Sequence, residues 1–229
     1  MSADVRDPIL VEDRGDVRVV RLRDGENRFD RTSVDRWHDV LGELERIEGP
    51  LAVVITGEGK FFSNGLDLDW MQAHPDDAGP MVEDVHRLLG RLYLLPAYTV
   101  AALNGHAFAG GAMLACAADV RVMRTDRGYW CLPEVDLGLP LTGPMFAAVT
   151  ARLPRAAAQD AILTGRRYTA VDAQRLGIVE HTAGEDQVLA RAVELAEPMA
   201  VKDRSVIAEH KRMLFADTAA TCGWRPGTS

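Results

Sequence analysis

Short apolar runs alternate with longer amphipathic stretches along the chain, and this alternation is typical of an α/β domain. The apolar runs have the length of buried strands, and turn residues separate the first two of them. The predicted strands are 9–11 and 17–22, joined by a turn at 13–15, and then 51–56, 99–103 and 120–124.

Apolar residues at helical spacing predict helices between and after these strands. Ser33 is expected to cap the first helix, whose apolar positions 34, 37, 41 and 44 share one face and which Gly49-Pro50 ends. A second helix is predicted at about 79–95, and a third begins near Gly110. Beyond residue 140 helices dominate the pattern, at about 144–152, 155–164, 170–176, 185–200 and 203–215.

Two Gly-rich segments each follow a predicted buried strand directly. The first is TGEGKFFSNGLDL at 56–68, and the second is NGHAFAGG at 104–111, which runs straight into a helix. Ligands bind at strand ends in α/β proteins, and glycine lets a ligand approach the backbone closely. Tight packing at a strand-to-helix corner explains such glycines equally well, so either segment taken alone leaves the choice open.

The composition narrows the class of protein. A chain of 229 residues with a net charge of −8 fits one domain, or one domain with a small appendage, and argues against nucleic acid or an anionic membrane as partner. Three cysteines without a C-x-x-C pair predict reduced thiols and no metal site. The N-terminus, MSADVRDPIL, has no apolar core of a signal peptide, and no run approaches the roughly 20 apolar residues of a membrane span. We therefore expect a cytoplasmic protein.

Four segments together resemble the crotonase (enoyl-CoA hydratase/isomerase) superfamily. FFSNGLDL at 61–68 and TVAALNGHAFAGGAMLACAADV at 99–120 are similar to its two signatures. LPEVDLGLP at 132–140 and LTGRRYTAVDAQRLGIV at 163–179 are similar to two further segments, in the family's order. The resemblance covers roughly residues 9–215.

The resemblance implies an α/β fold, a spiral of ββα units followed by a C-terminal helical region. The spiral core is expected at 1–185, and the helical region at 186–229 is expected to serve trimerisation and pocket closure. That region looks shortened, because the chain ends soon after Lys211. A homotrimer or a dimer of trimers is the implied assembly.

The family's common step is stabilisation of a thioester enolate by two backbone N–H groups, and the resemblance places these on Leu66 and Gly110. The residues themselves support Gly110, because the first N–H of a helix lacks an intrahelical partner and lies at the positive end of the helix dipole. Each such donor in a dry site is worth roughly 3–4 kcal/mol of transition-state stabilisation. Gly65 and Gly111 are expected to allow the close approach.

Glu134 is the predicted catalytic base. Its neighbours are largely apolar, and burial raises a carboxylate pKa so that the group can carry a proton near neutrality. Related hydratases use a second Glu where this chain has Met113, and dienoyl-CoA isomerases need a second acid where it has Thr142. The segments look most like plant-type Δ3,Δ2-enoyl-CoA isomerases. Asp136 is the nearest candidate for a second carboxylate, and on a strand it would face the same side as Glu134.

Acyl-CoA is the predicted substrate, with coenzyme A entering as part of it, and no separate cofactor or metal is expected. Asp67 is expected to cap the turn after the first signature. The predicted contacts of CoA and substrate are Arg28, Lys60, Ser63, Asn64, Gly65, Asp67, Leu68, Gly111 and Lys211.

Two alternative functions stay open at this point. One is an enoyl-CoA hydratase or another crotonase-type enzyme that acts on a specialised acyl-CoA. The other is a relative that binds acyl-CoA without catalysis. The negative charge and the lack of a basic stripe argue against an RNA-binding member.

Overall fold

The computed structural model describes residues 7–227 and contains two β-sheets. In the larger sheet the first two strands form an antiparallel hairpin, and every later strand joins in parallel. The strand order is β1 (Ile9–Arg14), β2 (Val17–Leu22), β3 (Ala52–Gly57), β5 (Tyr98–Leu103), β7 (Val120–Arg124) and β9 (His181–Ala183). These strands agree with the five predicted from apolar runs, and β9 is added at the edge.

The smaller sheet is made of three short parallel strands, β4 (Phe61–Ser63), β6 (His106–Phe108) and β8 (Trp130–Cys131). Each of them follows one strand of the large sheet: β4 follows β3, β6 follows β5, and β8 follows β7. A helix then leads to the next pair. Successive units therefore add one strand to each sheet, and the predicted α/β fold with ββα units is confirmed.

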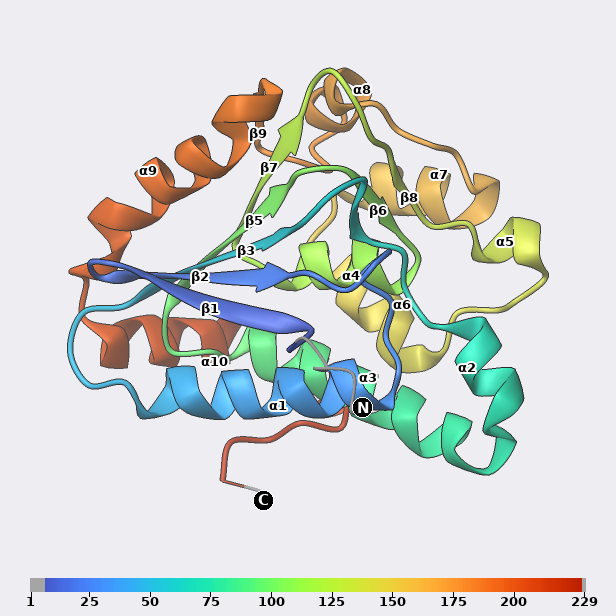
Figure 1. Cartoon of the computed structure of the whole chain (residues 1–229), viewed down its shortest axis with the longest axis horizontal. Coiled ribbons are helices and arrows are strands. Elements are labelled where there is room, and N and C mark those ends of the chain that lie inside the picture. Colours follow the sequence, from blue (N-terminus) through green and yellow to red (C-terminus); the bar gives the residue numbers. More distant parts are fainter. Residues whose placement is uncertain (1–6, 228–229) are drawn as a thin grey trace, which may run out of the picture.

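Helices cover both faces of the large sheet (Figure 1). Within residues 7–227, α9 is the helix that packs on one face, where its residues Ala192, Ala196 and Ala200 let it lie close to the valines and alanines of the strands. The other face packs on the main core, to which α1, α3, α4 and the end of α10 contribute. The helices are α1 (Arg31–Arg46), α2 (Leu68–Ala73), α3 (Pro75–Tyr93), α4 (Gly110–Ala117), α5 (Glu134–Leu137), α6 (Gly143–Thr150), α7 (Arg155–Thr164), α8 (Ala170–Arg175), η1 (Glu185–Gln187), α9 (Val188–Ala200) and α10 (Arg204–Thr221).

Several helix ends differ from the prediction. Asp30, not Ser33, caps α1: its carboxylate accepts the Ser33 N–H at 2.8 Å, while the Ser33 hydroxyl accepts the Asp30 N–H at 3.0 Å. This reciprocal pair is a capping box, in which Ser33 is the third helical residue. The helix α3 begins at Pro75 because proline is favoured in the first turn, where Asp76 and Asp77 also suit the helix dipole.

The C-terminal segment folds back onto the core. While α9 lies on the sheet, α10 continues to Thr221, beyond the predicted end at 215, and buries Phe215 and Ala219 in the main core. The role in trimerisation that was expected for residues 186–229 stays a prediction.

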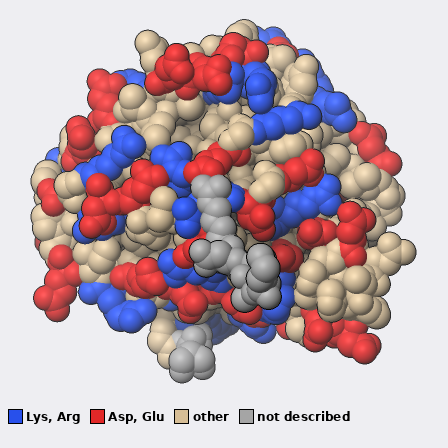
Figure 2. Space-filling view, viewed as in Figure 1, with Lys and Arg blue, Asp and Glu red and all other residues tan. Residues whose placement is uncertain are grey.

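Acidic and basic side chains are intermixed on the face shown in Figure 2, without a continuous basic stripe. No helix within residues 7–227 is long and apolar enough to cross a membrane. The signal-peptide prediction rests mainly on residues 1–6, which lie outside the described part of the chain.

Candidate active site

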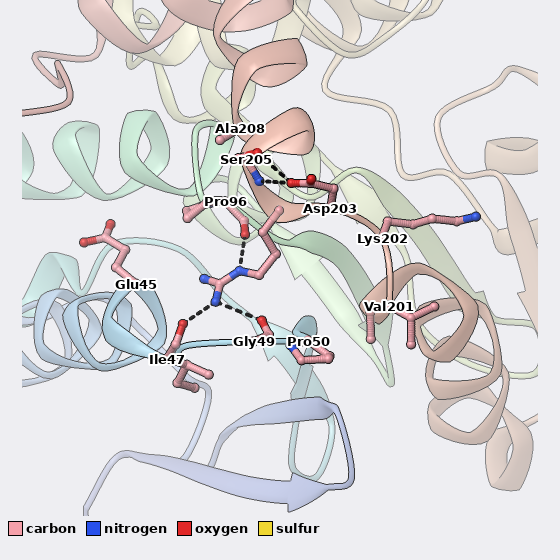
Figure 3. Close-up of a pocket in the computed structure, with 12 residues that line it drawn as sticks. Glu45, Ile47, Gly49, Pro50, Pro96, Val201, Lys202, Asp203, Ser205 and Ala208 are labelled. Carbon is pink, nitrogen blue, oxygen red and sulfur yellow. Dashed lines mark hydrogen bonds between the residues drawn. The ribbon is translucent and has the colours of Figure 1, made fainter.

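A surface pocket of about 490 Å³ lies between the end of α1, the start of β3 and the turn that joins α9 to α10 (Figure 3). Arg204 spans it and donates hydrogen bonds to the carbonyls of Pro96, Ile47 and Gly49. These carbonyls lie at the amino ends of the parallel strands, whereas ligands of α/β proteins bind at the carboxyl ends. Arg204 ties three chain segments together here, and the catalytic groups have to be sought at the other end of the strands.

The three parallel strands of the small sheet end at one edge, and each delivers one predicted site residue to it. Leu66 follows β4, Gly110 follows β6, and Glu134 follows β8. The Ala109 N–H donates to the Cys131 carbonyl at 3.1 Å, which joins the ends of β6 and β8 directly. The sheet therefore brings together residues that are far apart in the sequence.

The two signature segments contact each other at Gly65 and Gly110. A Cβ atom on Gly65 would lie 2.9 Å from the Gly110 nitrogen and 2.8 Å from the Cβ of Ala109. Gly65 also has φ +79°, a backbone conformation that side chains disfavour. A larger residue would force the loops apart, so this glycine sets their approach.

The N–H of Leu66 is left without a partner by the way its segment pairs with Phe29. The Phe29 N–H donates to the Gly65 carbonyl at 2.8 Å, and the Asp67 N–H donates to the Phe29 carbonyl at 2.9 Å. In such a parallel bridge the intervening N–H points to the opposite side. Among residues 7–227 nothing accepts a hydrogen bond from the Leu66 N–H, so it can serve a ligand.

The N–H of Gly110 is free because it opens α4. The residue before it, Ala109, has φ 50° and ψ −122°, a combination that costs an alanine about 1–3 kcal/mol. This turn lets the Ala109 carbonyl accept the Met113 N–H at 3.1 Å while the Gly110 N–H finds no acceptor in the described chain. The positive end of α4 adds to its attraction for an oxyanion.

Glu134 is the first residue of α5, and one oxygen of its carboxylate is buried without a hydrogen-bond partner in the described chain. Burial raises the pKa of Glu134 above its usual range. The segment is a helical turn rather than a strand, so Asp136 points about 200° away around the axis. Asp136 is exposed and lies against Gly165, and the expectation that it shares a side with Glu134 is wrong.

Met113 and Thr142 hold the two positions at which the family resemblance led us to expect a second acid in hydratases and dienoyl-CoA isomerases. Met113 is buried in α4, one turn after Gly110. Thr142 caps α6, and its hydroxyl lies 3.0 Å from the Nε2 of His86 on α3. Burial lowers the pKa of His86, so this imidazole is neutral near pH 7. His86 was not predicted, because nothing around it in the sequence marks it.

Two residues predicted to contact substrate hold the loop instead. Ser63 is fully buried; its hydroxyl donates to the Asn27 carbonyl at 2.7 Å and accepts the Gly65 N–H at 3.3 Å. Gly111 packs on the same serine, since a Cβ there would lie 2.2 Å from the Ser63 carbonyl oxygen. Both predictions of substrate contact are corrected to a role in packing the two signatures together.

The rest of the first signature is also held by its own polar contacts. The Asn64 amide donates to the Glu26 carboxylate at 2.7 Å. Asp67 accepts the Trp70 N–H at 3.0 Å and so caps α2, as predicted. Leu68, the next residue, is 45% exposed and is the member of this loop whose side chain is freest to meet a ligand.

Arg28 lies in an acidic pocket of about 310 Å³. Its guanidinium pairs with Glu26 at 2.7 Å and lies 3.8 Å from Asp67 and 3.6 Å from Asp69. These carboxylates already compensate its charge, which weakens the expected attraction for CoA phosphates.

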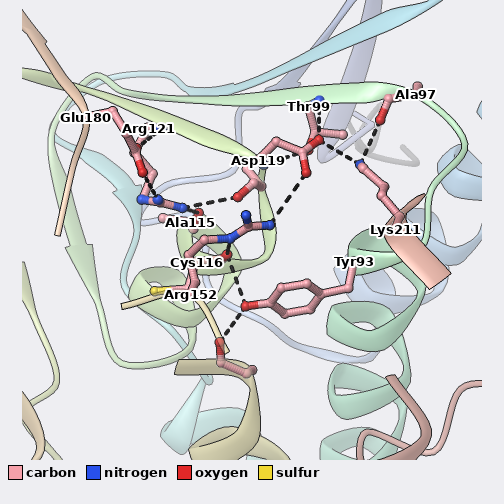
Figure 4. A network of polar contacts seen from close by, with 12 residues as sticks. Tyr93, Ala97, Thr99, Ala115, Cys116, Asp119, Arg121, Arg152, Glu180 and Lys211 are labelled. Carbon is pink, nitrogen blue, oxygen red and sulfur yellow. Dashed lines mark hydrogen bonds and ion pairs between the residues drawn. The ribbon is translucent and has the colours of Figure 1, made fainter. Parts of the chain in front are cut away.

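Lys211 is not available to CoA phosphates, contrary to the prediction. It is 4% exposed, and its ammonium pairs with Asp119 at 2.7 Å and donates to the Ala97 carbonyl at 2.7 Å (Figure 4). Asp119 also accepts the Thr99 N–H, so the pair joins α10 to the start of β5. Lys60 precedes β4 and so lies at the amino ends of the strands of the small sheet. Leu66, Gly110 and Glu134 follow the carboxyl ends of these strands, at the opposite edge.

The two-sheet spiral, with two unpaired amides and a buried carboxylate at one sheet edge, has the architecture of the crotonase fold. A probable enoyl-CoA hydratase from Mycobacterium tuberculosis superposes with a TM-score of 0.88 at 26% identity, over 95% of this chain and 92% of that one. The sequence model of the enoyl-CoA hydratase/isomerase family matches residues 12–222, and the chain belongs to this family.

Curated relatives with high coverage include plant and bacterial proteins. The chain is 35% identical to the peroxisomal enoyl-CoA delta isomerase 2 of Arabidopsis thaliana, over 93% of this chain and 94% of that protein. It is 37% identical to enoyl-CoA delta isomerase 3 of the same plant, over 84% of each. A putative enoyl-CoA hydratase of Thermus thermophilus is also 37% identical, over 89% of this chain and 82% of that protein.

Proposed function

We propose that this protein is an enoyl-CoA isomerase that moves the double bond of a 3-enoyl-CoA thioester to position 2. The observation that carries the proposal is the half-buried carboxylate of Glu134, one oxygen of which is buried and unpaired in the described chain, at the sheet edge shared with Leu66 and Gly110. A buried base with a raised pKa is suited to take up a proton and give it back.

In the proposed reaction the thioester oxygen accepts hydrogen bonds from the N–H groups of Leu66 and Gly110. Glu134 removes a proton from C2, and the electron pair of the broken C–H bond spreads over the dienolate. The same carboxyl then returns the proton to C4, and the double bond moves into conjugation with the thioester. Protons and electrons balance within the substrate, so the reaction needs no further reactant.

Met113 supports isomerisation over hydration. Adding water across the double bond requires a second group that activates the water, and a thioether cannot accept or donate that proton. The exposed position of Asp136 leaves Glu134 as the carboxylate proposed to do the chemistry. The names of the plant relatives agree with this choice, whereas the names of the bacterial relatives include hydratases.

Other parts of the proposal concern binding and assembly. Leu68 and Arg28 remain proposed contacts of the acyl-CoA. Lys211 is not proposed as a contact, because its ammonium is buried and paired with Asp119. A homotrimer or a dimer of trimers is proposed from the family. A cytoplasmic location is likewise a proposal, and two of the Arabidopsis relatives are named as peroxisomal.

The test uses purified protein and 3-hexenoyl-CoA, and follows formation of the conjugated product by absorbance. We expect turnover by the wild type, a loss of roughly 100- to 10,000-fold in Glu134→Gln, and full activity in the control Asp136→Asn. An inactive wild type, or an active Glu134→Gln, would refute the proposal.

Two further measurements separate the alternatives. Efficient hydration of crotonyl-CoA by the wild type would indicate a hydratase despite Met113. Calorimetric binding of an acyl-CoA without turnover of either substrate would indicate a binding protein that has lost catalysis.

A further inference from the structure

A second pocket lies at the opposite edge of the small sheet, at the amino ends of its strands. It has a volume of about 380 Å³, and its wall includes Lys60, His106, Arg127, Tyr129 and Thr169. Lys60 precedes β4, His106 begins β6, and Tyr129 precedes β8. No residue of the candidate active site lines it, so the two sites occupy opposite ends of the same three strands.

Positive charge in this pocket lacks compensation. Lys60 and Arg127 form no ion pair with a carboxylate of residues 7–227, and Lys60 instead lies 5.3 Å from the ring centre of Phe61. The one acidic residue of the wall, Asp126, is held by two hydrogen bonds from Arg124, at 3.0 and 2.6 Å. Both cations line one cavity in a chain of net charge −8. Their mutual repulsion falls when an anion binds between them.

His106 adds a hydrogen-bond donor to these charges. Its ring lies among Phe61, Phe108 and Tyr129, with centroid distances of 5.3, 4.9 and 5.7 Å. Desolvation, together with the nearby cations Lys60, Arg127 and Arg167, lowers the pKa of His106, so the ring is neutral near pH 7.

The position of the proton on this ring follows from its surroundings. The Nδ1 atom is sealed from solvent and has no hydrogen-bond partner in the described chain. A buried N–H without an acceptor costs about 1–3 kcal/mol, which favours the tautomer with its proton on Nε2. His106 therefore offers Nε2–H as the ring donor that can reach a ligand in the pocket.

We infer that this pocket binds a phosphate-type oxyanion, either inorganic phosphate or the phosphomonoester end of a larger ligand. Lys60 and Arg127 supply charge, and His106 Nε2–H supplies a hydrogen bond. The Thr169 hydroxyl, also in the wall, already donates to the Asp172 carboxylate at 3.2 Å. Charged donors to phosphate make short, strong hydrogen bonds. The inference concerns the amino edge of the small sheet and holds whether or not the proposed isomerase activity does.

The test titrates inorganic phosphate into the full-length protein by calorimetry and follows the His106 ring by NMR, with its signal identified by its absence in His106→Asn. We expect saturable binding to one site and an upward shift in the pKa of His106, because a bound dianion favours the imidazolium among Lys60, Arg127, Arg167 and Asp126. Lys60→Gln and Arg127→Gln should each weaken binding roughly fivefold, the effect of one partly exposed charge. Lys202→Gln, an exposed lysine on the turn before α10, is the matched control.

A second titration distinguishes the two sources of the anion. If a phosphomonoester is the ligand, adenosine 3′,5′-bisphosphate binds more tightly than phosphate and loses affinity in the same two variants. If free phosphate is the ligand, the nucleotide competes poorly and phosphate alone shows the dependence. Absence of saturable binding of either probe, or equal losses in Lys202→Gln and Lys60→Gln, would overturn the inference.

Discussion

Replacing Glu134 with Gln should lower activity and raise stability at the same time. Burial of an unpaired carboxylate oxygen raises the pKa of Glu134 in the folded chain above its value in the unfolded chain. The native state then holds this proton more tightly than the unfolded state. The stability that the group contributes is present at low pH and is lost as the pH rises through the folded-state pKa.

The size of the effect follows from the exposure of the group. Leaving a buried polar atom unsatisfied costs about 1–3 kcal/mol, and more when it is charged. Glu134 is only half-buried, so solvent screens its charge, and Gln keeps one polar atom in the same place. We therefore expect Glu134→Gln to raise the free energy of unfolding by about 1 kcal/mol at about pH 8, or the melting temperature by about 2–4 °C.

Thermal melts of wild type, Glu134→Gln and Asp136→Asn at about pH 8 and about pH 4 provide the assay. Near pH 4 the wild-type carboxyl is protonated, so the gain from Gln should shrink toward zero, and the exposed Asp136 control should show neither effect. Equal melting temperatures of wild type and Glu134→Gln at the higher pH would refute the reasoning. So would a gain that persists unchanged at the lower pH.

Further substitutions test other parts of the structure. Gly65→Ala should lower kcat/KM at least tenfold, because its Cβ would push against Gly110, whereas the control Gly59→Ala, with a similar φ of +72° and open space around it, should lose little activity. Lys211→Met should lower the free energy of unfolding in urea by about 3 kcal/mol, because Asp119 then keeps only the more distant Arg152, at 3.5 Å, as a cationic partner. A loss no larger than that of the exposed neighbour Arg212→Gln would contradict this. Ala109→Gly should stabilise the chain by about 1 kcal/mol, against the usual sign for this exchange, because glycine tolerates φ 50° and ψ −122°; a destabilised variant in the same urea assay would show that the turn is not strained.

The large sheet could be predicted because each of its inner strands is a local apolar run with its own signal. The small sheet could not, since β4, β6 and β8 contain only two or three residues each and exist through pairing between successive units. The cap of α1 was misplaced for a related reason. Both Asp30 and Ser33 are good capping residues, and both take part in the capping box, so residue type alone does not decide which one begins the helix.

The residues of the candidate site also differ in whether the sequence around them carries a local signal. Gly110 and Glu134 were predicted from the family resemblance, and the glycines at a helix start and the apolar neighbours of Glu134 supported it with local signals. The burial of Lys211 depends on Asp119, which is distant in the sequence, and a lysine on an amphipathic helix more often lies at the surface. His86 has no local signal either, since it meets Thr142 only when α3 and α6 pack together.

The backbone and the side chains of this site have separate roles. The two N–H groups are placed by Gly65, by the bridge to Phe29 and by the strained turn at Ala109, and none of these depends on the side chain at position 113. A change at position 113 on α4 therefore leaves the edge with the two free N–H groups intact while it adds or removes an acid. In the proposed mechanism an acid at this position would serve hydration. The buried thioether of Met113 cannot take that part, and the proposal therefore assigns the proton transfer to Glu134 alone.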